Sequence, residues 1–287
     1  MWNRFFGWQR ERPQDDRRSM ATLSNVAAEA RRLDPDRFLG ALFASDPARE
    51  ELWALVALDG MLAEVSASGR EPALGFIRLQ WWRDSIAAAT GAGAGSPQPV
   101  ISALTGAINR HRLGPDAFEP LLAARERELE GEPPADLAQL DQHIDILANA
   151  FARIALRMAG APSQAAYEAT TRISGAHALV QLAFTVPARA AHGRSHLPAA
   201  EGGRASTHGT AAAIEGLCAR ARMRLAEARA LRPAIESAAM PLLLPAVLIE
   251  SRLNALAAAG FDPYRVQVHP SALRVLRLAW ASLRARY

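Results

Sequence analysis

The histidines are the first candidates for chemistry in this chain, because imidazole binds metal ions and transfers protons near neutral pH. His192 and His196 have the four-residue spacing that metal-binding histidines use on helices. Gly193 separates them, however, and the next acidic residue is Glu201. A metal site is therefore not predicted at these histidines. Neither a glycine-rich phosphate loop nor a Ser-His-Asp arrangement stands out elsewhere in the sequence.

The remaining reactive side chains exclude further classes of chemistry. All 33 basic residues are arginine, so Schiff-base and lysine-nucleophile mechanisms are excluded. Cys218 is the single cysteine, which excludes an internal disulfide and a multi-cysteine metal site. Asp59 and Glu64 lie five residues apart, which corresponds to about 140° around a helix. These two carboxylates would not chelate one ion unaided.

The elements that must position these residues are predicted to be helices. Helical patterns run to about Ser66 from a cap at Ser45-Asp46-Pro47, and then over about 73–89, 99–111, 115–130, 137–159, 163–190, 210–231, 234–258 and 270–285. No strand and no fixed-period repeat is evident. The longest interval without a helical pattern is His192 to Gly209, which we interpret as a lid or partner-contact loop. The run Arg125 to Glu130 is interpreted as a solvated face of alternating charge.

Three segments resemble the squalene/phytoene synthase family. The stretch from the start of the first segment to the end of the third is somewhat over half of the chain. The most specific is Ile-Arg-Leu-Gln-Trp-Trp-Arg-Asp at residues 77–84, which ends the first segment, 37–84. The second segment, 125–160, includes Arg-Glu-Arg-Glu-Leu, and the third, 175–198, ends in Gly-Arg-Ser-His-Leu-Pro. The resemblance implies an all-α fold, a single-domain helical bundle around a central cavity. In that family two acidic motifs hold magnesium on a substrate diphosphate.

Both acidic motifs of the family are degenerate in this sequence. The first motif falls on 63–67, where Ala63, Glu64 and Ala67 stand at the acidic positions. The two aspartates of the second motif fall on Thr185 and Arg189. Ala63 and Ala67 are four residues apart, as are Thr185 and Arg189, so the two side chains of each pair lie on one face of a helix. Neither pair can act as a carboxylate clamp. We therefore expect no catalytic residue, no metal site and no cofactor, with magnesium bound only if the chain is an active prenyltransferase.

A ligand site without turnover remains open, because arginine binds phosphate directly and bidentately. We expect an apolar cavity that holds an isoprenoid or lipid tail. Arg78, Trp82, Arg189 and Arg194 are the predicted ligand-binding residues.

The departures from the family pattern resemble its divergent branch, which includes a mitochondrial assembly factor of respiratory complex I. This branch implies a non-catalytic accessory or assembly protein with a respiratory-complex partner. Two alternatives are an active prenyltransferase that condenses isoprenyl diphosphates, and a peripheral membrane protein that binds lipid. The expected location is the cytoplasm, at the inner face of a membrane if peripheral, or the mitochondrial matrix in a eukaryote.

The first 20 residues form a tail distinct from the helical domain expected over 21–287. Trp2, Phe5, Phe6 and Trp8 alternate with arginines, a composition that anchors a segment at a membrane surface or belongs to a frayed terminus. The net charge of +4 permits anionic partners such as lipid headgroups. Nucleic acid is not an expected partner, because the arginines are dispersed and no recognisable motif accompanies them.

Overall fold

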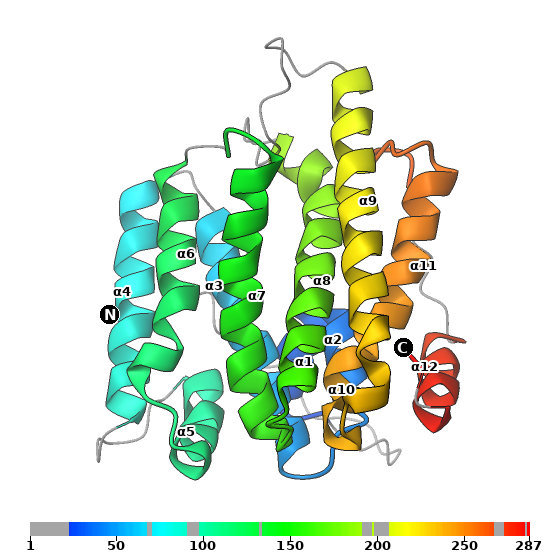
Figure 1. Cartoon of the computed structure of the whole chain (residues 1–287). Helices are drawn as coiled ribbons and strands as arrows, with labels where there is room; N and C mark the ends of the chain where they lie inside the picture. The colour runs from blue at the N-terminus through cyan, green and yellow to red at the C-terminus, as the bar shows by residue number, and fades with distance from the viewer. Residues whose placement is uncertain are drawn as a thin grey trace, which may run out of the picture.

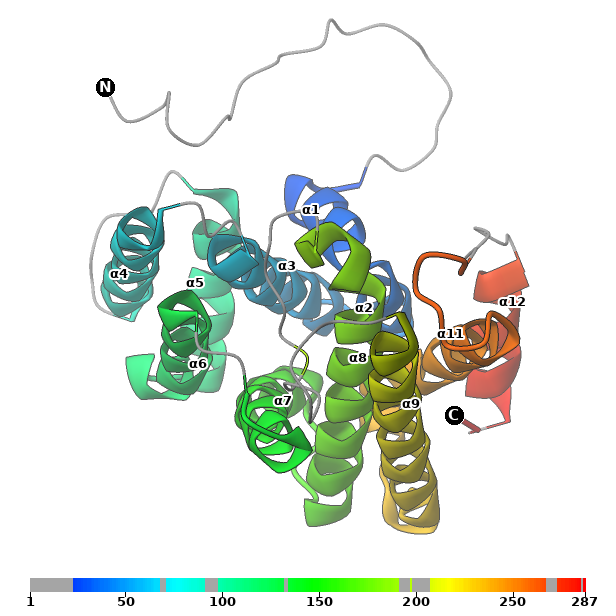
Figure 2. The same ribbon diagram turned by 90° about the horizontal axis from the view of Figure 1, so that it is seen from above.

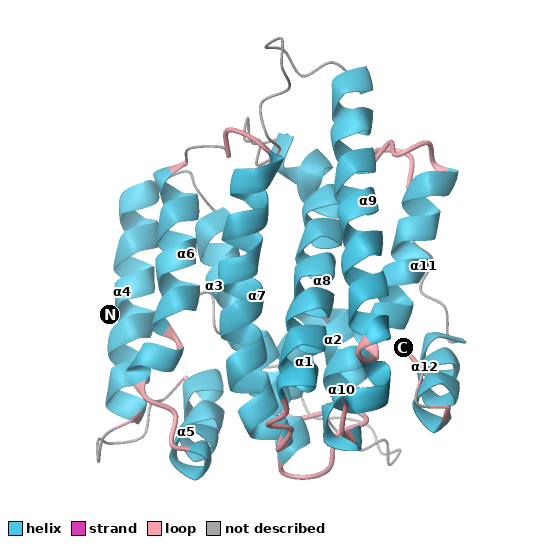
Figure 3. Ribbon diagram, in the orientation of Figure 1, coloured by secondary structure: helices cyan, strands magenta, loops and turns pink. Residues whose placement is uncertain are grey.

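Helices are the regular structure of the residues that the computed structural model describes, which are 23–67, 71–90, 98–131, 134–190, 197, 207–266, 273–284 and 286–287. Most of the long helices stand side by side as an upright bundle (Figure 1), and Figure 3 shows the same helices joined by loops and turns. The predicted all-α fold is confirmed over these residues. The division into a tail and one domain stays a prediction, because residues 1–22 lie outside the described residues.

The helices have the following bounds: α1 Asn25–Leu33, α2 Pro35–Ala41, α3 Ala48–Ala67, α4 Pro72–Ala89, α5 Pro99–His111, α6 Glu119–Glu130, α7 Leu137–Ala159, α8 Gln164–Ala190, α9 Thr207–Ala230, α10 Met240–Leu243, α11 Pro245–Ala258 and α12 Leu273–Leu283. Short 3-10 turns lie at η2 Pro115–Ala117, η3 Arg232–Ala234 and η4 Ser237–Ala239. Viewed from above, α4 and α12 lie at opposite edges of the bundle (Figure 2).

Local sequence signals explain where several of these helices begin and end. Ser24, Asp34 and Asp136 each accept a hydrogen bond from a backbone N–H three residues later, which satisfies a donor that the helix itself cannot pair. The helix α7 ends at Gly160, which has a φ of 70°. Glycine adopts this left-handed conformation without the steric cost that a side chain would bring.

The predicted helix over 234–258 is wrong, because the structure divides it into η4, α10 and α11. Pro241 and Pro245 lie at the start of α10 and α11, where the missing N–H of proline has no helical partner to lose. The predicted loop His192 to Gly209 is also too long, since α9 already begins at Thr207. The other residues of that loop, apart from Leu197, lie outside the described residues.

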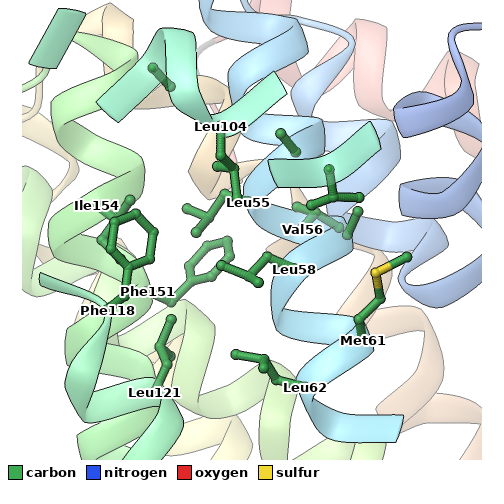
Figure 4. Packing of buried hydrophobic residues seen from close by; sticks show 14 of the residues in the cluster. Leu55, Val56, Leu58, Met61, Leu62, Leu104, Phe118, Leu121, Phe151 and Ile154 are labelled. Carbon is green, nitrogen blue, oxygen red and sulfur yellow. The ribbon is translucent and has the colours of Figure 1, made fainter. Parts of the chain in front are cut away.

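The core is built around α3, which is covered on nearly all sides. Leu55, Leu58 and Leu62 have no exposed surface, and they point toward buried residues of α6, α7 and the turn between η2 and α6 (Figure 4). Phe118 and Phe151 fill the space between these helices. Twelve of the 20 residues of α3 are buried, without a break from Leu52 to Leu58, so α3 is the central element of this half of the molecule.

The stretch Ser237–Ala258 is long and apolar enough to cross a membrane, but this is weak evidence for a span. Of its 18 most apolar consecutive residues, 61% are buried inside the bundle. The stretch comprises η4, α10 and α11, and α11 packs against α8 and α2. A core helix passes the same test of length and composition.

Candidate functional site

A cavity of about 1020 Å³ lies between α1, α3, α6, α7 and α8. Its volume lies at the upper end of the range that ligand sites usually have. The apolar part of its wall comes mainly from α7 and α8, which contribute Leu140, Ile144, Leu147, Ala178 and Leu182. A site of this size with an apolar wall is suited to a long hydrocarbon chain.

The opposite part of the wall carries a network of ion pairs. The Arg37 guanidinium lies 2.7 Å from one carboxylate oxygen of Asp59, and the Arg125 guanidinium lies 3.0 Å from the other. Arg37 also contacts Asp34 at 3.7 Å, and Arg125 lies 2.9 Å from Glu128. These five side chains are each 10–15% exposed, so the charges are largely withdrawn from water. We call Asp34, Arg37, Asp59, Arg125 and Glu128 the inner network.

Histidines lie at both ends of the inner network. His177 of α8 lies 3.3 Å from Asp34, and His143 of α7 lies 2.9 Å from Glu128. Ser66 of α3 donates a further hydrogen bond to Glu128. The network therefore joins α2, α3, α6, α7 and α8 through side chains that line one cavity.

The contacts of the inner network fix its charge. Burial favours the neutral form of Asp34, but His177 and Arg37 outweigh burial and hold the pKa of this carboxyl well below its usual range. Burial likewise opposes ionisation of Glu128, whereas the charge of Arg125 and hydrogen bonds from His143 and Ser66 lower its pKa. Burial also works against the charge of Arg125, yet Glu128 and Asp59 raise its pKa above the usual value. These groups stay ionised at neutral pH.

Glu64, the acid predicted to remain in the first motif, lies at the cavity rim. Both carboxylate oxygens of Glu64 accept hydrogen bonds from Arg32, at 2.7 and 3.0 Å, and Arg32 also bonds to Glu29. The side chains of Glu64 and Arg32 are each about half exposed, so this pair is open to solvent. Glu64 and Asp59 thus line the same cavity but bind different arginines.

The positions that the sequence predicts to be degenerate motifs lie on two walls of the cavity, as far as the structure describes them. Ala63, Glu64 and Ala67 line it from α3, and Thr185 lines it from α8. The Thr185 hydroxyl donates a hydrogen bond to the backbone oxygen of Leu182, one turn earlier in its own helix. The side chains at these positions include one carboxylate, that of Glu64.

The four predicted ligand-binding residues are not found in the described lining of the cavity. Trp82 is 5% exposed and packs in the core beside Trp81, at 5.0 Å between ring centroids. Neither Trp82 nor Arg78 belongs to the cavity lining. Arg189 lies in α8, but its side chain is outside the described residues, as is the whole of Arg194. Their roles as ligand contacts stay predictions.

The interpretation of Arg125 to Glu130 as a solvated face is wrong for two of its residues. Arg127 and Glu130 are exposed, but the side chains of Arg125 and Glu128 are only 11% and 12% exposed and belong to the inner network. Arg125 and Glu128 are three positions apart, so they share one helix face. That pairing is visible in the sequence, whereas Asp59 and His143, which draw the pair inward, come from other helices.

The described cavity residues do not fit the magnesium that the family pattern implies. Magnesium is bound through carboxylate oxygens in near-octahedral geometry. Here the oxygens of Asp59, Glu64 and Glu128 already face arginine or histidine, and no group of three or more His, Cys, Asp or Glu in the described residues could hold a metal ion.

Comparison with known proteins assigns both the sequence and the fold to one group. The family model described as squalene/phytoene synthase matches residues 30–277. The chain is 23% identical over 296 residues to NADH dehydrogenase (ubiquinone) complex I, assembly factor 6 of Bos taurus, and covers 86% of that protein. It is 26% identical over 153 residues to presqualene diphosphate synthase of Rhodopseudomonas palustris, a match that covers 53% of this chain and 54% of the synthase.

Two solved structures have the same fold. Squalene synthase HpnC from Alicyclobacillus acidocaldarius matches 83% of this chain and 94% of its own, with a TM-score of 0.68 and 19% identity. A dehydrosqualene synthase in complex with ligand matches 90% of this chain and 94% of its own, with a TM-score of 0.71 and 13% identity.

Proposed function

The chain belongs to the squalene/phytoene synthase family, and we propose that it is a non-catalytic accessory or assembly protein that holds an isoprenoid or lipid tail in its cavity. The observation that carries this proposal is the pairing of the cavity carboxylates with arginine. Asp59 contacts Arg37 and Arg125, and Glu64 contacts Arg32. A magnesium-dependent condensation would require these acids to bind the metal instead of their arginines, and for Asp59 this would break two largely buried ion pairs.

The relatives named as complex I assembly factor 6 support an assembly role, because they match this chain over nearly its whole length. A respiratory-complex protein is therefore the proposed partner. Fold alone would be a weak argument for function, since one fold serves many activities. The pairing of the acids and the length of these matches support the proposal independently of each other.

An active prenyltransferase is the alternative, and the match to presqualene diphosphate synthase supports it over about half of the chain. Deleting the gene in the source organism would distinguish the two functions. We expect the deletion strain to lose assembled, active respiratory complex I on native gels while its isoprenoid hydrocarbons stay unchanged in a lipid extract. Loss of the hydrocarbons with normal amounts of the complex would contradict the proposal.

Peripheral contact with an anionic membrane is a second candidate function, and the C-terminal helix favours it. Leu273, Leu276, Trp280 and Leu283 follow the spacing of one helix face, and each is more than half exposed. Leu278 and Ala281 on the other side of α12 are buried against Leu244 and Leu248 of the bundle. Four arginines and no acid occur in 273–287, although Arg274 is paired with Asp36. A helix that presents leucine and tryptophan to solvent beside arginines is typical of a membrane-surface segment.

Vesicle flotation tests this second candidate. Leu276→Asn with Trp280→Asn should reduce binding to vesicles that contain anionic lipid, whereas Val275→Asn should not. Val275 is 45% exposed on the same helix but lies off the apolar stripe, so it controls for a general loss of hydrophobicity. The N-terminal tail lies outside the described residues, and deletion of residues 2–12 tests its separate role as an anchor. Unchanged flotation of the double variant would exclude α12 as the membrane contact.

A further inference from the structure

The fixed charges along the cavity wall do not complement an anionic ligand. The inner network contains three carboxylates, those of Asp34, Asp59 and Glu128, and only two guanidiniums, those of Arg37 and Arg125. Its fixed charge is therefore −1. His143 and His177 contribute at most one positive charge each, and only when protonated.

The rim of the cavity adds no positive excess among the described residues. Arg32 is balanced by Glu64, to which it is bonded. Arg127 and Glu130 are the other charged residues of the described rim, and they carry opposite charges. A diphosphate would thus meet a rim without excess positive charge and, when both histidines are neutral, an inner wall with a net charge of −1.

We infer that the natural occupant of this cavity is an uncharged isoprenoid-type molecule, such as a prenyl alcohol or a prenyl hydrocarbon, rather than a prenyl diphosphate. This inference rests on the proposed function, because a magnesium-loaded enzyme would offer a different charge to its ligand. Arg37 and Arg125 are not free to bind a phosphate. Each of them already lies between two carboxylates, and those carboxylates repel an incoming anion.

The same wall can accept a neutral polar head. The amide of Gln181 and the hydroxyl of Thr185 lie on the α8 side, and Gln142 and His143 lie on the α7 side. The Thr185 oxygen can accept a hydrogen bond while its own proton is donated to Leu182, and the Gln142 amide can both donate and accept, so a hydroxyl can bind here without carrying a charge. Leu140, Ile144 and Leu182 supply apolar surface for the chain that follows the head.

Isothermal titration of the purified full-length protein with farnesol and with farnesyl diphosphate tests the inference. The titrations are run at pH 8, above the usual titration range of imidazole, once with EDTA and once with magnesium. Farnesol should bind with the same affinity under both conditions, and about tenfold more tightly than the diphosphate, because the ester brings unbalanced negative charge to the wall. Equal or tighter binding of the diphosphate, or no saturable binding of farnesol, would overturn the inference.

Two alanine-to-leucine substitutions show whether farnesol binds in this cavity. Ala178 lines the cavity from α8, so Ala178→Leu should fill part of it and lower farnesol affinity by about tenfold or more, as a blocked apolar site implies. Ala87 is exposed on α4, and Ala87→Leu is the matched control that should leave affinity unchanged. Circular dichroism and a thermal melt confirm that both variants fold. If both variants lost affinity equally, or if neither lost affinity, farnesol would not bind at this location.

The results can contradict the inferred ligand without contradicting the proposed function. Tighter binding of the diphosphate without turnover would overturn the inference that the natural ligand is uncharged. The proposed non-catalytic role would remain. Release of inorganic diphosphate from farnesyl diphosphate would overturn the non-catalytic role itself.

Discussion

Arg125 is the residue on which the inner network most depends, because it lies between Asp59 and Glu128 with only 11% of its side chain exposed. Replacing it with methionine would leave two largely buried carboxylates short of a partner. We predict that Arg125→Met lowers the free energy of unfolding by about 3–5 kcal/mol, the usual cost of removing one member of a buried ion pair. Urea denaturation followed by circular dichroism measures the change.

Arg127→Met is the matched control on the same helix. Arg127 is exposed and lies two residues later, so its replacement should change stability by no more than about 0.5 kcal/mol. If the two variants were equally stable, the inner network would contribute nothing to the fold, and the account of its charges would fail.

The pH dependence of stability follows from the lowered pKa of Glu128, whose charge is favoured by Arg125 and by hydrogen bonds from His143 and Ser66 against the cost of burial. A carboxyl whose pKa is lower in the folded state contributes its full stability above its unfolded pKa of about 4.3, and loses it as the pH falls toward the folded value. The wild-type protein should therefore lose stability below about pH 4. The stability difference between wild type and Glu128→Gln should shrink over the same range.

Urea denaturation at pH 7, 5, 4 and 3 checks this expectation. Glu130→Gln serves as the control, because Glu130 is exposed near the end of the same helix. A stability difference between wild type and Glu128→Gln that grew on acidification would have the wrong sign for a lowered pKa.

The packing of α2 against α10 and α11 depends on a glycine. A Cβ added at Gly40 would lie 2.6 Å from the backbone oxygen of Pro241 and 3.0 Å from the ring of Pro245. Neither a backbone carbonyl nor a proline ring can turn aside, so Gly40→Ala should destabilise the protein by about 1–3 kcal/mol. Thermal or urea denaturation measures the loss.

Gly106→Ala is the control for Gly40→Ala. Gly106 lies inside α5 with no atom within 4 Å of an added Cβ. Alanine is the better helix former, so this variant should gain about 0.5–1 kcal/mol. Destabilisation by both substitutions would point to a cause other than the contact with α10 and α11.

Sequence periodicity predicted most helices within a few residues, because the apolar pattern of a helix is local in the sequence and several helices are bounded by a capping residue, a proline or a glycine. The exception was 234–258, where apolar periodicity continues across two prolines that in fact begin new helices at α10 and α11. The burial of Arg125 and Glu128 was missed for a different reason. Alternating charge favours a solvated face, and only the tertiary positions of Asp59 and His143 turn this face inward.

At the scale of the whole molecule, the fold is that of the squalene/phytoene synthase family, and the carboxylates on the described wall of its cavity are paired with arginines. The resemblance in the sequence was sufficient to predict the family and the fold. It could not reveal the arginines that bind the cavity acids, because Arg32, Arg37 and Arg125 reach Glu64 and Asp59 from distant parts of the chain.

The central claim is that this protein does not condense isoprenyl diphosphates. The direct measurement is incubation of the purified protein with farnesyl and geranylgeranyl diphosphate and magnesium, following release of inorganic diphosphate and formation of hydrocarbon, with an intact squalene synthase as the positive control. We predict no turnover above the protein-free background for a sample that circular dichroism shows to be folded. Turnover that Glu64→Gln abolishes would contradict the account, because Glu64 would then act as a metal ligand despite its pairing with Arg32.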